Sequence, residues 1–172
     1  MEFEKLMNAR HSTRGFSGKR LSEDEVRELV RAGTLAPNAC NMQSWHFYAV
    51  VGDAVEKLYP DSYANEWIKT AGAAILVCAE DGELCAHFGE RARDLFILQD
   101  TAAAATMILL RAADMGMSGC FIGSFREEAC RRAFSVKENH IPVALLAIGY
   151  ETELQTPEKS RKPLDSVLTI VK

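Results

Sequence analysis

The stretch AAILVCA, residues 73–79, constrains the fold more than any other part of the sequence. It is a short, unbroken apolar run, and such a run favours a β-strand that is covered on both faces. Downstream, a long helix is predicted from about Gly89 to Met115, because apolar residues and alanines recur at helical spacing and Gly116 is placed to cap its end. The many alanines indicate that a neighbouring helix or backbone approaches this helix closely. We therefore expect a layered structure around a buried strand.

Helices and strands alternate along the rest of the chain. One amphipathic helix is predicted over residues 2–9, and a second carries a capping box of Ser22 and Glu25 and ends at Pro37. The other predicted strands are SWHFYAVV, GCFIG and PVALLAIGY. A further helix is expected between SWHFYAVV and the run 73–79, and another at SFREEACRRAF, with Ser124 and Glu127 as a second capping box. This order predicts a single α+β domain over residues 1–172. The tail ends in a short apolar stretch that cannot bury itself, so it should pair with a sheet of its own subunit or of a partner.

Composition and charge exclude several classes of function. The chain is 48% hydrophobic and 26% charged, which is typical of a soluble globular protein. Its net charge of -4 argues against a nucleic-acid or acidic-membrane partner. No apolar run reaches the ~20 residues of a membrane span, and the N-terminus lacks the apolar core of a signal peptide, so we expect a cytoplasmic protein. Five cysteines without CxxC spacing argue against a disulfide framework and against a metal site.

The stretch RHSTRGF, residues 10–16, concentrates hydrogen-bond donors near the N-terminus. In an extended segment Arg10, Ser12 and Arg14 point to one side, while His11 and Thr13 point to the other. Arginine forks match phosphate oxygens, although a solvated charged loop explains the stretch equally well. The tail motif EKSRKP adds Lys159 and Arg161. Together the two motifs could offer four positive charges to one terminal phosphate.

Two further segments could contact a ligand. The loop LAPNACNMQSWHF carries the amides of Asn38, Asn41 and Gln43 beside aromatic residues, which suits the polar edge of a planar heterocycle. The alternative is that these amides only satisfy backbone groups of the loop. In GCFIGSF, Gly123 follows a strand and could let a ligand lie close to main-chain N–H groups, or it could serve only the turn. Neither GxGxxG nor a P-loop occurs, so a nucleotide site would have to be built differently.

Taken together, RHSTRGF, APNACNMQSWHF, GCFIGSF, ALLAIGY and KSRKPLDSV resemble the nitroreductase family in order and spacing. The resemblance covers nearly the whole chain. It implies a nitroreductase-like α+β fold, with a central, mostly antiparallel sheet flanked by helices, in an intertwined homodimer. It also implies an FMN-dependent enzyme that takes electrons from NADH or NADPH. The C-terminal tail, about residues 151–172, would then pack on the partner subunit.

The same resemblance assigns binding residues to this chain. The residues that would bind the FMN phosphate are Arg10, His11, Ser12, Arg14, Lys159 and Arg161. The loop that would reach the flavin across the dimer interface carries Pro37, Asn38, Asn41 and Gln43. The backbone contact near flavin N5 would come from Ile122 and Gly123. Asn65 matches a flavin-contacting asparagine of longer members only loosely. The chain departs from the family in having Asn38 where serine is frequent and Ser44 where proline is frequent, which would alter the loop geometry.

The implied reaction uses no catalytic side chain, because the flavin carries the redox chemistry. NAD(P)H delivers hydride to N5, and a nitroaromatic, quinone or similar small-molecule acceptor then takes its place, giving ping-pong kinetics. Two alternatives remain open from the sequence. One is a flavin-binding sensor or carrier without turnover. The other is a related dehalogenase-type flavoenzyme, which the short segment 80–88 disfavours because such enzymes usually need a longer lid.

Overall fold

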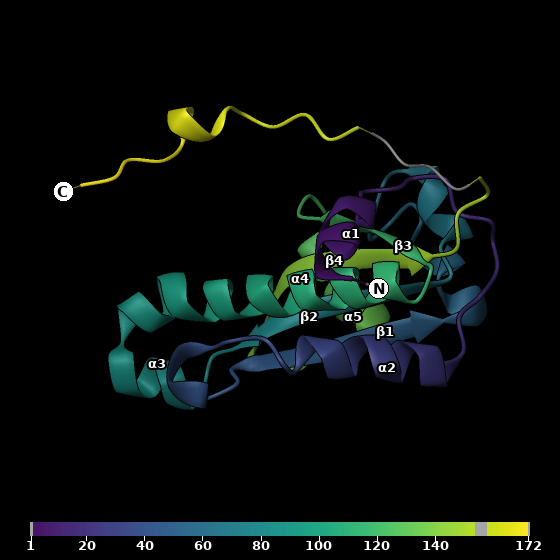
Figure 1. Cartoon of the computed structure of the whole chain (residues 1–172). Helices are drawn as coiled ribbons and strands as arrows, with labels where there is room; N and C mark the ends of the chain where they lie inside the picture. Colours follow the sequence, from purple (N-terminus) through teal and green to yellow (C-terminus); the bar gives the residue numbers. More distant parts are fainter. Residues whose placement is uncertain (1, 154–157, 172) are drawn as a thin grey trace.

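The computed structural model describes residues 2–153 and 158–171. Its centre is a four-stranded antiparallel sheet in the order β1-β2-β4-β3 (Figure 1). The strands are β1 (Trp45–Val51), β2 (Ala73–Glu80), β3 (Ser118–Ile122) and β4 (His140–Gly149). The expected α+β architecture with an antiparallel sheet is therefore confirmed.

Strand β2 lies in the middle of the layers, as its apolar run predicts. Every residue from Ala73 to Ala79 has no exposed surface. One face of the sheet packs against α2 (Glu23–Gly33) and α4 (Ile97–Asp114), and the other packs against α5 (Glu127–Phe134) and the segment 52–70. Successive β2 side chains alternate between the two cores, which is why a continuous apolar run was needed.

Helix α4 approaches its neighbours closely, as its alanines indicated. A Cβ added at Gly33 of α2 would lie 2.8 Å from Ile108, and one added at Gly119 of β3 would lie 2.5 Å from Leu109. The helical stretch Ala92–Asp114 is long and apolar enough, by length and composition alone, to cross a membrane. Its buried residues pack on the sheet and on α2, as in the core helix of a globular domain.

Several local predictions were wrong. The segment expected to be a short connection contains a separate helix, α3 (Glu83–Phe88). The predicted long helix is present, although its turn Ala92–Phe96 is π-helical. The predicted helix between β1 and β2 is three short 3₁₀ segments, Gly52–Ala54, Glu56–Leu58 and Glu66–Thr70. The capping box at Ser22 and Glu25 is confirmed, but Ser124 and Glu127 form none, because α5 begins at Glu127. Helix α2 ends at Gly33, four residues before Pro37.

The two ends of the chain expose apolar side chains. Helix α1 (Phe3–Ala9) packs beside α4 but has no buried residue. Residues 158–171 run outward from the sheet as an extended tail (Figure 1). The apolar side chains of this tail are exposed, from 48% for Leu168 to 89% for Val171. The apolar side chains of the tail therefore lie on the surface of the chain, and the pairing of the tail with a sheet of its own or of a partner stays a prediction.

Candidate functional site

The segment 10–14 has the alternation that its sequence predicted. His11 and Thr13 are buried, whereas Ser12 and Arg14 are exposed. Ser12 forms an isolated parallel bridge with Gly119 in β3, so the segment lies along this edge of the sheet. The exposed side of the segment therefore presents a hydroxyl and a guanidinium together, as a phosphate site requires.

The imidazole ring of His11 makes hydrogen bonds within the protein. Its Nδ1 lies 2.9 Å from the carbonyl oxygen of Ala9, and its Nε2 lies 2.7 Å from Oε1 of Glu151. A carbonyl oxygen only accepts, so Nδ1 donates, and the contact to Glu151 needs a second proton shared between the ring and the carboxyl group. Both side chains are nearly inaccessible to solvent. In this arrangement His11 fixes the segment to the start of the tail and does not offer its ring to a ligand.

The backbone around His11 joins the two ends of the chain. The amide of Thr152 donates to the carbonyl of Gly15, and the amide of Ser17 donates to the carbonyl of Tyr150. The chain after β4 is thereby held against the N-terminal motif before it continues into the tail. This explains how two motifs almost 150 residues apart reach one place.

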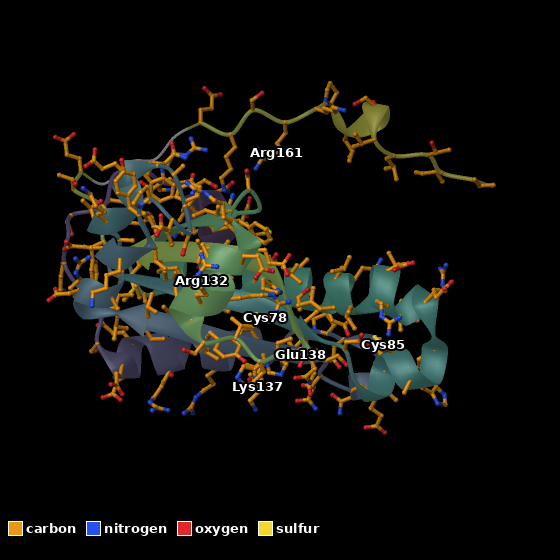
Figure 2. All side chains as sticks on the ribbon, turned by 180° about the vertical axis from the view of Figure 1, so that it is seen from behind. Cys78, Cys85, Arg132, Lys137, Glu138 and Arg161 are labelled. Carbon is orange, nitrogen blue, oxygen red and sulfur yellow. The ribbon has the colours of Figure 1, made fainter. Side chains whose placement is uncertain are left out.

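Three of the predicted cations, Arg10, Lys159 and Arg161, lie close together there, and the fourth, Arg14, lies at the β3 edge. The amino group of Lys159 donates to the carbonyl oxygen of Met7, and its pKa is lowered by burial and by the nearby charges of Arg10 and Arg161. Arg161 belongs to the exposed tail (Figure 2). Arg14 lies against the thiol of Cys120. Burial raises the pKa of this thiol, and the charge of Arg14 opposes the rise. Within residues 2–153 and 158–171, none of these four cations forms an ion pair with a carboxylate.

The donor set of this cluster suits a phosphate dianion. The like charges around Lys159 disfavour its protonated form, and a bound anion would remove that penalty. Arginine forks and a serine hydroxyl supply directional donors to phosphate oxygens. The residues present therefore fit the phosphate end of FMN.

The loop 37–43 has an unusual backbone. Cys40, Asn41 and Gln43 all have left-handed φ angles, at 52°, 55° and 53°. Asn38 stabilises this shape from within, because its Oδ1 accepts from the amide of Gln43 at 2.9 Å and its Nδ2 donates to the carbonyl of Ala36. Such conformations are costly for residues other than glycine and gather at functional sites.

The amides of this loop divide between two uses. Asn38 and Gln43 satisfy backbone groups, since Nε2 of Gln43 donates to the carbonyl of Asn41. This is the alternative that the sequence left open for them. The loop has three side-chain amides. That of Asn41 is exposed and makes no hydrogen bond with any described residue. Asn41 is therefore the amide best placed to contact a ligand.

Asp100 in α4 anchors the loop, and sequence reasoning missed it. Both of its carboxylate oxygens lie within 3.1 Å of the Ala39 amide nitrogen, which donates to them. The side chain is buried, and burial raises its pKa while the Ala39 hydrogen bond opposes the rise. Asp100 also lines an open groove of about 660 Å³ beside the loop, together with Pro37, Asn38, Ala39, Cys40, Phe88, Phe96, Gln99 and Ala103.

The end of β3 leaves room for a ligand. Ile122 is buried, whereas Gly123 is exposed and a Cβ added to it would meet nothing within 4 Å. Next to it lies a hollow of about 220 Å³ lined by Ser62, Tyr63, Ala64, Asn65, Ser124, Phe125 and Arg126. The structure thus brings Asn65 close to the backbone that follows Gly123, a proximity that the sequence alone did not establish.

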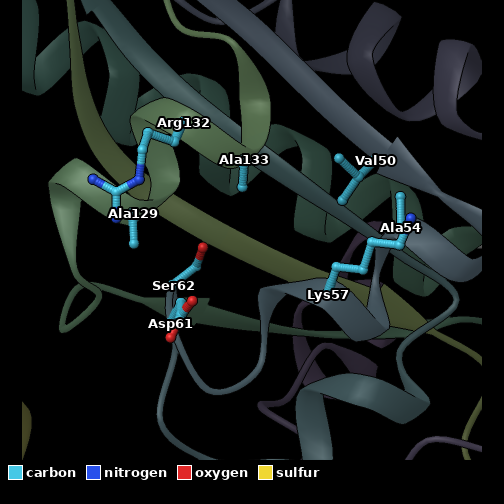
Figure 3. A pocket seen from close by; sticks show the side chains of 8 residues that line it. All are labelled: Val50, Ala54, Lys57, Asp61, Ser62, Ala129, Arg132 and Ala133. Atoms are coloured by element: carbon cyan, nitrogen blue, oxygen red, sulfur yellow. The ribbon is translucent and has the colours of Figure 1, made fainter.

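Other features of the surface do not contribute to this arrangement. Another hollow has a volume of about 320 Å³ and contains none of the predicted binding residues. Figure 3 shows the side chains that line it, with Arg132 and Lys57 on opposite sides. Four of the five cysteines are buried and all are free. Burial raises the pKa of the Cys78 thiol to about 12, so this thiol stays protonated (Figure 2). The interpretation of the cysteines as mostly buried thiols is confirmed.

The two halves of the predicted site do not meet within the described part of one chain. The loop 37–43 lies beside α3, at one end of the chain's fold (Figure 1). The cations lie near α1 and the β3 edge, toward the other end. No hydrogen bond among the described residues joins the two groups.

Comparison with known proteins agrees with the fold and the motifs. Residues 7–150 match the model of the Nitroreductase family. A relative from Archaeoglobus fulgidus, provisionally named NADH dehydrogenase/NAD(P)H nitroreductase, is 30% identical over 85% of this chain and 83% of its own length. The solved structure of a nitroreductase family protein from Streptococcus pneumoniae superposes with a TM-score of 0.87 at 19% identity, covering 99% of this chain and 100% of the other. A protein from Staphylococcus epidermidis provisionally named NAD(P)H:FMN oxidoreductase gives a TM-score of 0.80 at 18% identity, covering 99% and 96%. The chain therefore belongs to the nitroreductase family.

Proposed function

We propose that the protein is an FMN-dependent enzyme that uses NADH or NADPH to reduce nitroaromatics, quinones or similar small acceptors. Its family membership makes it an NAD(P)H-dependent oxidoreductase. The observation that supports FMN most directly is that Arg10, Lys159 and Arg161 lie close enough for their charges to interact, with Arg14 on the exposed side of the same segment as Arg10. None of the four forms an ion pair with a carboxylate among the described residues. A terminal phosphate is the group that four such cations fit best.

The residues of this cluster would divide the binding of the phosphate. Arg10, Arg14, Lys159 and Arg161 supply charge and N–H donors, and Ser12 supplies a hydroxyl. His11 would act indirectly, because its hydrogen bonds to Ala9 and Glu151 hold the segment that carries the donors. The resemblance to the family placed His11 among the residues that bind the cofactor. We propose instead that His11 supports the binding segment without contacting the cofactor.

The remaining assignments concern the ring system. When bound, FMN would supply the hydride-accepting and hydride-donating chemistry, and the protein would orient its ring and tune its electronics. The open backbone at Ile122 and Gly123 would lie against one edge of the ring, with Asn65 nearby. The loop of Pro37, Asn38, Asn41 and Gln43 would reach the ring from the partner subunit, with Asn41 making the direct amide contact. No side chain of the chain is required as a nucleophile or proton carrier.

A homodimer would unite the separated halves. The cations and the loop 37–43 lie toward opposite ends of one subunit, so each site needs one half from each copy. The tail 158–171 gives the second reason, since its apolar side chains are exposed. A groove of about 560 Å³ along α2 and the edge strand β1 offers it an apolar surface, lined by Glu23, Val26, Arg27, Val30, Arg31, Phe47, Ala49 and Val51. We propose that the tail of one copy packs into this groove of the other.

The decisive test is direct. The purified protein is mixed with FMN, and its visible absorbance, its mass in solution and its bleaching by NADH or NADPH without oxygen are measured. We expect one FMN per chain in a dimer, with rapid bleaching. A protein that retains no FMN contradicts the proposal. FMN that binds but is not reduced by either nucleotide would indicate a sensor or carrier instead.

A further inference from the structure

The backbone of the loop 37–43 is held in a costly shape by very few contacts. Three residues that carry side chains, Cys40, Asn41 and Gln43, adopt left-handed φ angles. Such conformations persist only where the surroundings over-determine them. The local hydrogen bonds of the loop come from the side chains of Asn38 and Gln43 and from the short 3₁₀ turn Ala39–Asn41. They shape the loop but do not fix it to the rest of the subunit.

Asp100 supplies the polar attachment. Among the described residues, the Asp100 carboxylate is the only side chain of another element that forms a hydrogen bond with residues 37–43, and it lies 61 residues away in the sequence. Apolar contacts of Ala39 and Met42 with the core around α3 accompany it. A buried carboxylate is normally disfavoured, and here a backbone N–H compensates it. A buried acidic residue in an otherwise apolar helix needs such a reason to be there.

We propose that Asp100 is a positioning residue for the flavin. By accepting a hydrogen bond from the backbone amide of Ala39, it keeps the side-chain amide of Asn41 in place for the ring of FMN. The inference rests on the proposed function, because it assumes that the loop contacts FMN. It adds a residue that does not itself touch the cofactor. A pre-organised amide donor favours the flavin state with more negative charge, which is the reduced one. Asp100 is therefore expected to raise the reduction potential of the bound flavin.

Two variants remove the same hydrogen bond from its two sides. Asp100→Leu removes the acceptor at similar side-chain size. Ala39→Pro removes the donor at a first helical position that suits proline, and it keeps a small apolar side chain against the core around α3. Asp100→Asn keeps one acceptor oxygen and serves as the conservative variant. Thr101→Val is the matched control, because Thr101 is the next buried residue of α4 and its hydroxyl bonds only Ile97 and Leu98.

The first measurement needs no flavin. Hydrogen exchange of the loop 37–43 is followed in the FMN-free protein, and we expect Asp100→Leu and Ala39→Pro to speed exchange in this loop at least tenfold. Asp100→Asn should restore most of the protection, and Thr101→Val should leave the loop unchanged. This measurement tests the attachment itself, so it gives an answer even if the protein binds no FMN.

The second measurement is the two-electron reduction potential of bound FMN. If the loop favours reduced over oxidised FMN tenfold, then losing the attachment lowers the potential by about 30 mV. A general loss of packing would weaken both flavin states alike and leave the potential unchanged. The inference would be overturned if Ala39→Pro matched the wild type in both loop exchange and flavin potential. It would also be overturned if Thr101→Val changed exchange and potential as much as Asp100→Leu does. Failure of the wild type to bind FMN would instead overturn the proposed function.

Discussion

The N-terminal segment 10–14 and the loop 37–43 were both predicted to hold FMN, but they differ in what determines their shape. In the first, the two-residue period of an extended chain places His11 and Thr13 inside and Ser12 and Arg14 outside. In the second, three left-handed residues are held partly by Asn38 and partly by a carboxylate 61 residues away. Local periodicity therefore predicted which side chains of the first segment are exposed, whereas the shape of the second segment depends on a distant residue.

The largest expected effect tests the outward side of the first segment. Arg14→Ala should weaken FMN binding by ~1.5–3 kcal/mol, the size of a hydrogen bond to a charged group. Arg14→Lys should lose less, because the charge stays and only the planar fork is removed. Titration of the FMN-free protein measures both. Arg132→Ala is the control, since it removes an exposed arginine from the surface around the unrelated hollow of Figure 3. Equal affinities for Arg14→Ala and the wild type would contradict the assigned role.

The inward side of the same segment should show a different response. His11→Ala removes the buried hydrogen bond between the imidazole and Glu151 and the bond to the carbonyl of Ala9, so the free energy of unfolding should fall by ~1–3 kcal/mol. Denaturant unfolding of the FMN-free protein measures this loss. Arg14→Ala should unfold like the wild type in the same experiment, because Arg14 is exposed. If His11→Ala were fully stable and yet failed to bind FMN, His11 would be a ligand contact and the contrast between the two sides would be lost.

The tail contribution to the cluster can be isolated through pH. Burial and the charges of Arg10 and Arg161 lower the pKa of free Lys159, and a bound phosphate dianion would raise it again. Binding therefore favours the protonated lysine, so affinity for FMN should be full below the lowered pKa and should fall as the pH rises through it. Lys159→Arg keeps its charge throughout this range, so the difference in pH dependence between it and the wild type reports Lys159 alone. Parallel profiles would place Lys159 outside the site.

These contrasts explain what the sequence could and could not predict. The strands and the larger helices followed from apolar periodicity, and β2 from its continuous apolar run. Helix α3 was missed because EDGELCAHF is too short to show a period, and the false capping box at Ser124 arose because a matching pair of residues does not fix where a helix begins. Asp100 could not be assigned a partner, since no local pattern links an acidic residue in an apolar helix to the backbone amide of Ala39.

The smallest expected effect separates the two uses of amides within the loop 37–43. Asn41→Ala should weaken FMN binding by ~0.5–1.5 kcal/mol and leave stability unchanged, because the side-chain amide of Asn41 makes no hydrogen bond among the described residues. Asn38→Ala removes two hydrogen bonds that shape the loop, so it should increase hydrogen exchange of the loop without FMN. Measuring affinity and exchange for both variants tests each against the other. If Asn38→Ala kept the exchange of the wild type, the loop would be fixed by Asp100 and apolar packing alone. If Asn41→Ala bound FMN normally, the loop would act through its shape and not through an amide contact.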